Sequence, residues 1–340
     1  MEILAIDDLS VEYRARGAVV RAVDQVSFAV PQGEIVGLVG ESGCGKTTLA
    51  RAITGVLPGQ ARVTGGGIMF DGQDLEALPR ADRHALRWRE IAFIPQSAMN
   101  SLDPVYRVGS QLREVLRERG GISGAAADRR IAELFDMVGL DPRRAREYPH
   151  QFSGGMRQRV AIALALALDP KLVIADEPVT ALDVIVQRQV LDTFRDLQAR
   201  LNLSVILVTH DISVVAYACD QVVVMYAGKV VETGPARAVM EMPAHPYTMG
   251  LYNAFPDLRA RHDALVPIAG APPDLRAPPP GCRFAERCPF ALPACRSASP
   301  FLQRAGNGHA SACLRLDDIA RLRAEAKDPA TWHRSSTFAA

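Results

Sequence analysis

The sequence lacks a long apolar run. Its longest uninterrupted apolar stretch, Val160 to Leu168, is far too short to cross the hydrocarbon core of a bilayer. The first residues, Met1 to Leu4, lack a basic segment followed by a long apolar one, so the sequence does not begin like a secretory signal. We therefore expect a soluble, intracellular protein that has no membrane span of its own.

The chain also has almost no net charge. Its formal net charge is +1 with 23% charged residues, so there is no electrostatic bias toward nucleic acid, and we expect no nucleic-acid partner. Hydrophobic residues make up 48% of the 340 residues, enough for a sizeable core. This length fits one large domain with an appendage, or two domains. In an intracellular protein the six cysteines should be reduced unless they bind metal.

The most specific feature is the segment Gly40-Glu41-Ser42-Gly43-Cys44-Gly45-Lys46-Thr47-Thr48, which fits the pattern G-x-x-x-x-G-K-[ST]. It follows the apolar run from Glu34 to Val39 and precedes a predicted helix from Thr47 to Val56. Because glycine has no Cβ, the backbone N–H groups of such a loop can converge on phosphate oxygens, and the helix N-terminus adds partial positive charge. Lys46 is placed to reach the β- and γ-phosphates, and the Thr47 hydroxyl to ligate Mg²⁺.

A pair of carboxylates follows a second apolar strand. The run from Leu172 to Ala175 is apolar throughout, as in parallel sheets buried on both faces, and it ends in Asp176 and Glu177. An Asp at the end of a strand beside the phosphate loop can hold Mg²⁺, directly or through water. The adjoining Glu can polarise a water for attack on the γ-phosphate. The alternative is a strand that simply ends at solvent.

The third feature is Ser153-Gly154-Gly155, which stands at the start of another predicted helix. A serine hydroxyl and an unobstructed glycine N–H at a helix start form a second anion-binding arrangement. One chain has little use for two phosphate cradles on one triphosphate, whereas a head-to-tail dimer can present each Ser-Gly-Gly segment to the nucleotide of the other subunit. The alternative is a plain N-cap at Ser153.

The remaining pattern predicts strands before the phosphate loop and a helical insertion after it. The strands expected from alternation and apolar runs are 2–13, 20–30, 91–96, 172–175 and 204–209, with a hairpin over 221–232 that turns at Ala227-Gly228. The helices expected from helical spacing are those within 108–140, 157–168 and 184–201.

With these three features in this order, residues 2 to 250 resemble the ATP-binding subunit of ATP-binding-cassette (ABC) transporters. The resemblance implies an α/β fold of the P-loop NTPase class. Its parts are a RecA-like core with a mainly parallel sheet, an N-terminal antiparallel β subdomain, a helical insertion and a small cysteine-rich C-terminal extension. It also implies ATP hydrolysis with ATP and Mg²⁺ as the bound ligands.

The resemblance assigns further roles. Gln96 matches the glutamine that senses Mg²⁺ and the γ-phosphate where membrane subunits dock, and His210 matches the switch histidine that contacts the γ-phosphate. Ala181-Leu182-Asp183 matches the loop that communicates across the dimer, and Tyr13 matches the aromatic residue that stacks on adenine. The implied catalytic residues are Glu177, His210 and Gln96, and the implied Mg²⁺ residues are Thr47, Gln96 and Asp176. The implied nucleotide-binding residues are Tyr13, Gly40, Ser42, Gly43, Cys44, Gly45, Lys46, Thr47, Thr48, Ser153, Gly154, Gly155 and Asp183.

Several segments resemble the peptide-importing branch of the family. The common Leu-Ser-Gly-Gly-Gln motif has Phe152 and Met156 at its ends here, positions that carry neither the serine hydroxyl nor the glycine N–H. This variant, the segment 98–104 and His245-Pro246-Tyr247-Thr248 resemble the dipeptide/oligopeptide and nickel importer class. The chain is therefore expected to act peripherally at the cytoplasmic face of the inner membrane.

The partners implied by this resemblance are a second ATPase subunit, giving a heterodimer, two transmembrane permease subunits and an extracytoplasmic substrate-binding protein. Nickel and oligosaccharide import are alternatives within the same branch. A soluble, non-transport ABC ATPase acting on DNA or ribosomes is an alternative from another class. Such proteins usually carry two cassettes, a long coiled-coil insertion or a basic face, and none of these is seen here.

The C-terminal part has a different composition. Cys282, Cys288, Cys295 and Cys313 follow a connector, Pro267 to Pro280, that contains six prolines. Four thiolates can bind Zn²⁺ or an iron–sulfur cluster, and free thiols or disulfides are a further alternative. The absence of paired Cys-x₂₋₄-Cys knuckles counts against zinc. The segment Gly281 to Pro289 resembles the peptide-importer extension, which can hold a [4Fe–4S] cluster.

These features suggest a division of the chain. The expected parts are an ATPase domain over residues 1–255 with a helical subdomain at about 97–160, the extension over 256–326, and a flexible tail over 327–340.

Overall fold

The computed structural model describes residues 1–15, 17–253 and 267–333. The N-terminal strands form an antiparallel sheet of the order β2-β1-β4-β5. Its strands are β1 (Glu2–Ala15), β2 (Ala18–Pro31), β4 (Ala61–Phe70) and β5 (Gln73–Asp74). Apolar side chains on one face of this sheet, such as Leu9, Val11 and Val26, are fully buried, which follows from the alternating pattern of the two long strands.

The larger sheet has the order β11-β12-β10-β9-β3-β8-β7-β6. Its central strands are β3 (Ile35–Val39), β6 (Ile91–Ile94), β7 (Leu172–Asp176), β8 (Ser204–Thr209) and β9 (Gln221–Tyr226), and they pair in parallel. Strands β3, β7 and β8 are buried along their whole length, which explains their nearly continuous apolar composition. Because the strands are parallel, their carboxyl ends meet at one edge, where the polar residues predicted from sequence follow them.

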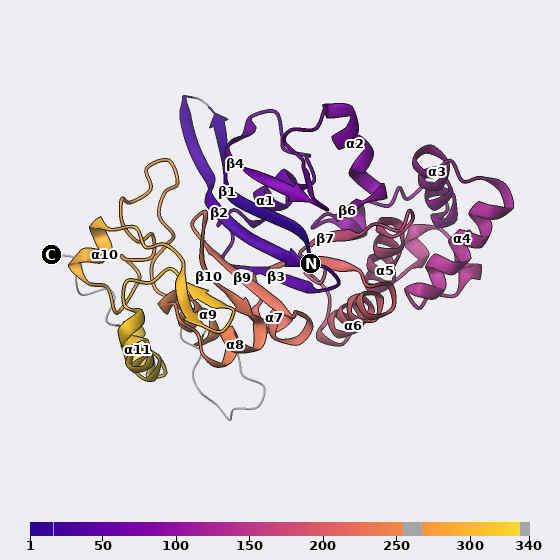
Figure 1. Cartoon of the computed structure of the whole chain (residues 1–340). Helices are drawn as coiled ribbons and strands as arrows, with labels where there is room; N and C mark the ends of the chain where they lie inside the picture. Colours follow the sequence, from indigo (N-terminus) through magenta and orange to yellow (C-terminus); the bar gives the residue numbers. More distant parts are fainter. Residues whose placement is uncertain (16, 254–266, 334–340) are drawn as a thin grey trace.

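Helices cover this sheet and extend to one side of it (Figure 1). The helices of the core are α1 (Lys46–Ile53), α2 (Arg80–Arg89), α5 (Gly154–Ala165), α6 (Val184–Leu201), α7 (Ile212–Ala218), α8 (Ala236–Glu241) and α9 (Pro246–Asn253). The predicted helical insertion forms α3 (Val108–Gly120) and α4 (Gly124–Met137), which lie beyond α5 at one end of the molecule (Figure 1). Short 3₁₀ turns occur at Ala98–Asn100, Pro142–Arg146, Pro149–Gln151 and Leu316–Asp318.

The C-terminal segment lies at the opposite end of the molecule and joins the larger sheet (Figure 1). Its elements are α10 (Pro293–Ser297), β11 (Gln303–Gly306), β12 (His309–Ser311), α11 (Ile319–Ala326) and α12 (Pro329–His333). Strand β12 pairs antiparallel with β10 (Lys229–Pro235). Phe284 packs edge-on against Tyr226 and Tyr247, with ring centroids 5.2 and 5.4 Å apart, so the extension shares an apolar core with the ATPase part.

The predicted fold class agrees with this architecture, and several boundaries differ. Helix α5 begins at Gly154 rather than Arg157, because the Ser153 side chain caps it. The first two strands extend further toward their turn than predicted. Residues Pro329–His333, expected in a flexible tail, are helical, and Trp332 is buried with its indole N–H donated to the Ala326 carbonyl. The rest of that tail, 334–340, lies outside the described residues, and no described helix is long and apolar enough to cross a membrane.

Candidate nucleotide-binding site

The loop between β3 and α1 has a conformation that only glycine permits at two positions. Gly45 has φ of +107°, and a Cβ there would lie 2.3 Å from the carbonyl oxygen of Ala22. At Gly40 an added Cβ would lie 2.1 Å from the carbonyl oxygen of Met225. The backbones of β2 and β9 therefore press directly against this loop, which explains two of the glycines in the motif.

The start of helix α1 is left open for an anion. Its N-cap, Gly45, has no side chain that could cap the backbone N–H groups of the first turn. The Lys46 side chain is buried against the loop, with Nζ 2.6 Å from the Gly40 carbonyl and 3.0 Å from the Glu41 carbonyl. The uncapped helix N-terminus and the Lys46 ammonium group together favour a phosphate group at the loop.

The Asp176 carboxylate lies at the end of β7, only 2% exposed. Burial raises the pKa of Asp176, and a hydrogen bond from Thr47 partly offsets this effect. The Oδ1 atom of Asp176 is buried without a hydrogen-bond partner among the described residues. A buried carboxylate oxygen of this kind beside a threonine hydroxyl fits the oxygen ligands that Mg²⁺ prefers.

The other two predicted catalytic residues, Gln96 and His210, both contact the Glu177 carboxylate. Its Oε2 atom accepts hydrogen bonds from Gln96 Nε2 and Thr180 Oγ1, both at 3.0 Å, and its Oε1 atom lies 3.1 Å from His210 Nδ1. Burial alone would raise the pKa of Glu177, but the hydrogen bonds from His210 and Thr180 outweigh burial and hold it below its ordinary value. Glu177 is therefore an ionised carboxylate at neutral pH and can act as a base.

The backbone at Glu177 is also unusual. Its φ is +50°, in the left-handed region that non-glycine residues rarely adopt, and its N–H donates to the Val208 carbonyl at 2.8 Å. Such strain persists only where the surrounding structure imposes it, and it is most frequent at functional sites. Strand β8 thus fixes the direction in which the Glu177 carboxylate points.

The Ser-Gly-Gly segment packs against the loop before α6. Ser153 Oγ accepts a hydrogen bond from Met156 N at 3.4 Å, and Asp183 caps α6 by accepting one from Val186 N at 3.0 Å. A Cβ at Gly155 would lie 2.2 Å from a methyl group of Val186, so the two helix starts touch. Within this chain the capping bond of Ser153 stays in its own helix, and Figure 1 places α5 away from α1.

The remaining predicted nucleotide residues lie along the loop. Tyr13 Oη is 3.3 Å from Thr48 Oγ1, which places this aromatic residue at the end of the phosphate-binding motif. Ser42 and Gly43 form the exposed crown of the loop, and Gly43 has φ of +81°. The Cys44 carbonyl accepts a hydrogen bond from Gly228 N at 2.9 Å, and burial raises the pKa of the Cys44 thiol.

The four C-terminal cysteines line one small cavity together with His245, Phe284 and Phe290. None of the four forms a disulfide bond. Burial raises the pKa of Cys282 and Cys288, and raises that of Cys313 to about 11. Among the described residues, no three His, Cys, Asp or Glu side chains form a group that could hold a single metal ion.

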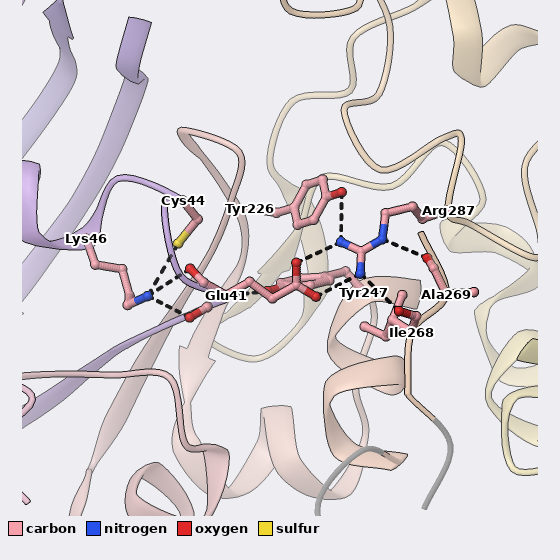
Figure 2. Close-up of polar contacts among 9 residues, drawn as sticks. Glu41, Cys44, Lys46, Tyr226, Tyr247, Ile268, Ala269 and Arg287 are labelled. Atoms are coloured by element: carbon pink, nitrogen blue, oxygen red, sulfur yellow. Dashed lines mark hydrogen bonds and ion pairs between the residues drawn. The ribbon is translucent and has the colours of Figure 1, made fainter. Parts of the chain in front are cut away.

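Some residues around the loop were not predicted. Glu41, within the motif, binds Arg287 of the C-terminal segment, and Tyr247 binds the Glu41 backbone (Figure 2). Both Arg287 and Tyr247 fall in segments whose resemblance to peptide importers was noted from sequence. Their contacts with Glu41 span more than 200 residues of chain, so no local pattern could show them.

Family models and curated relatives both assign this chain to ATP-binding proteins of ABC transporters. Residues 23–180 match the family model described as "ABC transporter", and residues 231–295 match the one described as "Oligopeptide/dipeptide transporter, C-terminal region". The dipeptide transport ATP-binding protein DppD of Bacillus subtilis is 43% identical over 333 residues, which cover 96% of this chain and 99% of that protein. DppD of Escherichia coli is 43% identical over 94% of this chain and 99% of its own length.

Solved structures of similar fold include a dimeric, post-hydrolysis state of the ATP-binding cassette MJ0796 bound to ADP and Pi. That match has a TM-score of 0.61 and 28% identity, and it covers 69% of this chain and 99% of the cassette. The cbiO1 subunit from Clostridium perfringens, part of the ABC transporter complex cbiONQ, has a TM-score of 0.61 and 25% identity over 71% of this chain and 91% of its own.

Proposed function

Because the chain belongs to the ABC transporter family of ATP-binding proteins and is therefore an ATPase, we propose that it powers peptide import by closing as a dimer on ATP. The observation that carries the catalytic part is the hydrogen-bonded group of Gln96, Glu177 and His210 beside the phosphate-binding loop. The peptide cargo is supported by the printed functions of the relatives and by the match of residues 231–295 to a peptide-transporter region.

The site residues would share the chemistry in a simple way. Backbone N–H groups of the loop and Lys46 bind the β- and γ-phosphates, and Tyr13 stacks on the adenine. Glu177 accepts a proton from the attacking water, while His210 and Gln96 keep its carboxylate oriented. Thr47, Asp176 and Gln96 would hold Mg²⁺, which supplies charge neutralisation at the phosphates when bound.

A partner subunit would complete the site. We infer that Ser153, Gly155 and Asp183 of this chain face the nucleotide held by the partner. Two observations support this: Ser153 is exposed although it caps its own helix, and Val184 and Ile185 beside Asp183 are 75% and 72% exposed, as a surface awaiting a partner would be. The similar cassette MJ0796 is described as dimeric. In the cell the partner would be a second, related ATPase.

A groove next to Gln96 suits a membrane partner. This groove has a volume of about 780 Å³ and lies between β6 and α3. Its lining includes Pro95, Leu102, Tyr106 and Val115. Tyr106 in its lining is 59% exposed, and the preceding residue, Val105, is 69% exposed. We propose that a permease subunit docks here, that the transporter contains two permease subunits, and that a separate extracytoplasmic binding protein selects the cargo. The chain would then sit peripherally at the cytoplasmic face of the membrane.

For the four cysteines we propose a [4Fe–4S] cluster, with zinc as the alternative. Four buried or partly buried cysteine side chains around one cavity form a donor set of the kind that holds a four-thiolate cluster. The absence of paired Cys-x₂₋₄-Cys knuckles in the sequence speaks against zinc. Anaerobically purified protein should be brown with absorbance near 400 nm if the cluster is present. Colourless protein that contains stoichiometric zinc would favour the alternative.

We also propose the division into an ATPase domain over 1–255 with a helical subdomain at about 97–160 and an extension over 256–326, to which the helix Pro329–His333 is added. The boundary at 255/256 lies outside the described residues. Two separate family matches, to residues 23–180 and to residues 231–295, support a division into two parts, and the second match begins before residue 255. The helical arm of α3 and α4 also stands apart from the core sheet in Figure 1.

The function is tested by reconstituting the chain with its partner subunits in proteoliposomes. We expect ATP-dependent uptake of a labelled dipeptide in the presence of the binding protein, and uptake that stops when Lys46 is replaced by Ala. Uptake of Ni²⁺ chelates or oligosaccharides instead would reassign the cargo within the branch. ATP hydrolysis that responds to DNA or ribosomes, and not to the permeases, would contradict the transport function.

A further inference from the structure

The nucleotide-binding loop is held from outside by the cysteine-rich extension, through an ion pair between Glu41 and Arg287 (Figure 2). Arg287 Nη1 lies 2.7 Å from Glu41 Oε2, and Nη2 lies 2.9 Å from Oε1. This two-point geometry is the one in which arginine binds a carboxylate most strongly. The Arg287 side chain is only 7% exposed, so solvent screens this pair less than a surface pair.

The other donors of the guanidinium group are also satisfied. Nη1 donates to Tyr226 Oη at 3.1 Å, Nε donates to the Ala269 carbonyl at 3.0 Å, and Nη2 donates to the Ile268 carbonyl at 3.2 Å. Arg287 therefore has one fixed position, set by the extension on one side and by β9 on the other. Because Arg287 contacts the Glu41 carboxylate at two points, it also fixes the position of that carboxylate.

Glu41 is in turn joined to the part of the loop that would bind phosphate. Its backbone N–H donates to Tyr247 Oη at 2.8 Å, and its carbonyl accepts a hydrogen bond from Lys46 Nζ at 3.0 Å (Figure 2). Lys46 is the residue that we assign to the β- and γ-phosphates. Any displacement of Glu41 therefore changes the surroundings of the Lys46 ammonium group.

A second arginine of the same segment reaches the other side of the loop. Arg283 pairs with Asp24 and donates to the Ala227 carbonyl, and the next residue, Gly228, donates its N–H to the Cys44 carbonyl at 2.9 Å. Arg283 directly follows Cys282, and Arg287 directly precedes Cys288. Each of these arginines is therefore the sequence neighbour of a cysteine that lines the four-cysteine cavity.

We propose that Arg287 is a positioning residue of the ATP site, an inference that rests on the proposed ATPase function. It holds Glu41 so that the loop keeps the shape that receives a triphosphate, and it makes nucleotide affinity depend on the order of the four-cysteine cavity. A pair that served stability alone would leave nucleotide affinity unchanged when it is removed from a folded protein.

The test compares Arg287→Gln, Arg287→Lys and Glu41→Gln in the full chain with the matched control Arg276→Gln. Arg276 also belongs to the extension and also binds a carboxylate, that of Asp274, but it is 66% exposed and that contact is local. The measurements are the equilibrium affinity for fluorescent Mg-ADP and the thermal unfolding midpoint. Arg287→Gln should weaken binding by about tenfold, within the range of about 5- to 150-fold usual for coupled sites. The control should bind like the wild type.

The pair must also behave as a unit. The double variant Glu41→Gln/Arg287→Gln should bind no more weakly than Arg287→Gln alone, because both changes remove the same contact. Arg287→Lys should give an intermediate loss, since it keeps the charge but not the two-point geometry. In the assembled transporter, KM for ATP should rise while kcat stays near the wild-type value, because Arg287 touches no reacting atom.

The link to the cysteine cavity has its own measurement. Cys288→Ser should weaken Mg-ADP binding in the wild-type background and produce no further loss in the Arg287→Gln background. Additive losses would show that the cavity acts on the loop by another route and would overturn this part of the proposal.

The outcomes separate this inference from the function on which it rests. If folded Arg287→Gln binds Mg-ADP as tightly as the wild type, Arg287 has no positioning role, while the ATPase function stands. If the wild-type chain itself binds no nucleotide, the proposed function fails first. Should Arg287→Gln fail to fold, Arg287→Lys and Glu41→Gln carry the same comparison, and wild-type affinity in both would overturn the proposal.

Discussion

The Nδ1 atom of His210 lies 3.1 Å from the Oε1 atom of Glu177. Because an ionised carboxylate can only accept hydrogen bonds, this nitrogen carries the hydrogen and donates it. The two residues directly follow the paired parts of β8 and β7, which run in parallel side by side. The topology of the sheet therefore brings together a base and the residue that orients it, although 33 positions separate them in sequence.

Replacing Glu177 by Gln should leave ATP binding nearly unchanged and reduce the turnover number by at least about 100-fold, the usual contribution of a general base. The amide keeps the size of the side chain but cannot accept a proton. Turnover by the assembled transporter and equilibrium ATP affinity are the two measurements. Glu241→Gln, which alters an exposed helix pair with Arg237, is the control. Near-normal turnover of the Glu177 variant would remove this residue from the mechanism.

The pH dependence of hydrolysis should respond to Thr180. In the wild type the pKa of Glu177 lies below its ordinary value of 4.5, so the base is ionised at higher pH and activity is lost only as pH falls through the lowered pKa. Thr180→Val removes a hydrogen bond that lowers this pKa. The acid limb of the pH–rate profile should therefore move to higher pH. A limb that stays in place, or moves to lower pH, would contradict the assignment of the base.

Removal of Mg²⁺ should act through Asp176. Hydrolysis should stop when EDTA is added to the wild type, and Asp176→Asn should reduce Mg²⁺-dependent turnover by about 100-fold or more, because it removes a charged oxygen ligand. The variant should also need more Mg²⁺ for half-maximal turnover. A Mg²⁺ titration that is identical in the variant and the wild type would show that Asp176 does not hold the ion.

The attachment of the extension should depend on Glu232. This carboxylate is fully buried and accepts hydrogen bonds from the backbone N–H groups of Ala244 and His245 and from His309 Nε2, at 2.6, 2.9 and 2.7 Å. Glu232→Ala leaves these donors unpaired and should cost about 3–5 kcal/mol in the free energy of unfolding. Urea unfolding measures this loss. The exposed control Glu241→Ala should change stability by less than about 1 kcal/mol, and equal losses in both variants would contradict this role of Glu232.

The sequence predicted the central part of the fold because its signals are local. The apolar strands β7 and β8 and the helix α6 lie where the pattern placed them, and α6 has the predicted bounds. The catalytic roles of Gln96, Glu177 and His210 were inferred from resemblance and stay predictions, while the structure shows that the three side chains are in contact. These three residues follow the neighbouring parallel strands β6, β7 and β8, so the sheet places them at the same edge.

The parts that were not predicted depend on contacts between distant residues. Strands β11 and β12 are short, and β11 is largely exposed, so only the pairing of β12 with β10 makes them strands of the larger sheet. Arg287 and Glu41 are 246 positions apart, and neither has a local pattern that indicates its partner. Helix α12 is fixed by the burial of Trp332, which a short polar segment does not reveal.

The central claim is that one ATP is gripped by Lys46 of one subunit and by the Ser-Gly-Gly segment of its neighbour. The most direct measurement is a structure of the assembled complex that carries Glu177→Gln and is trapped with Mg-ATP. We predict that Ser153 Oγ lies within hydrogen-bond distance, about 3 Å, of the γ-phosphate bound to the neighbouring ATPase subunit. A trapped complex in which Ser153 lies far from every γ-phosphate would contradict the account.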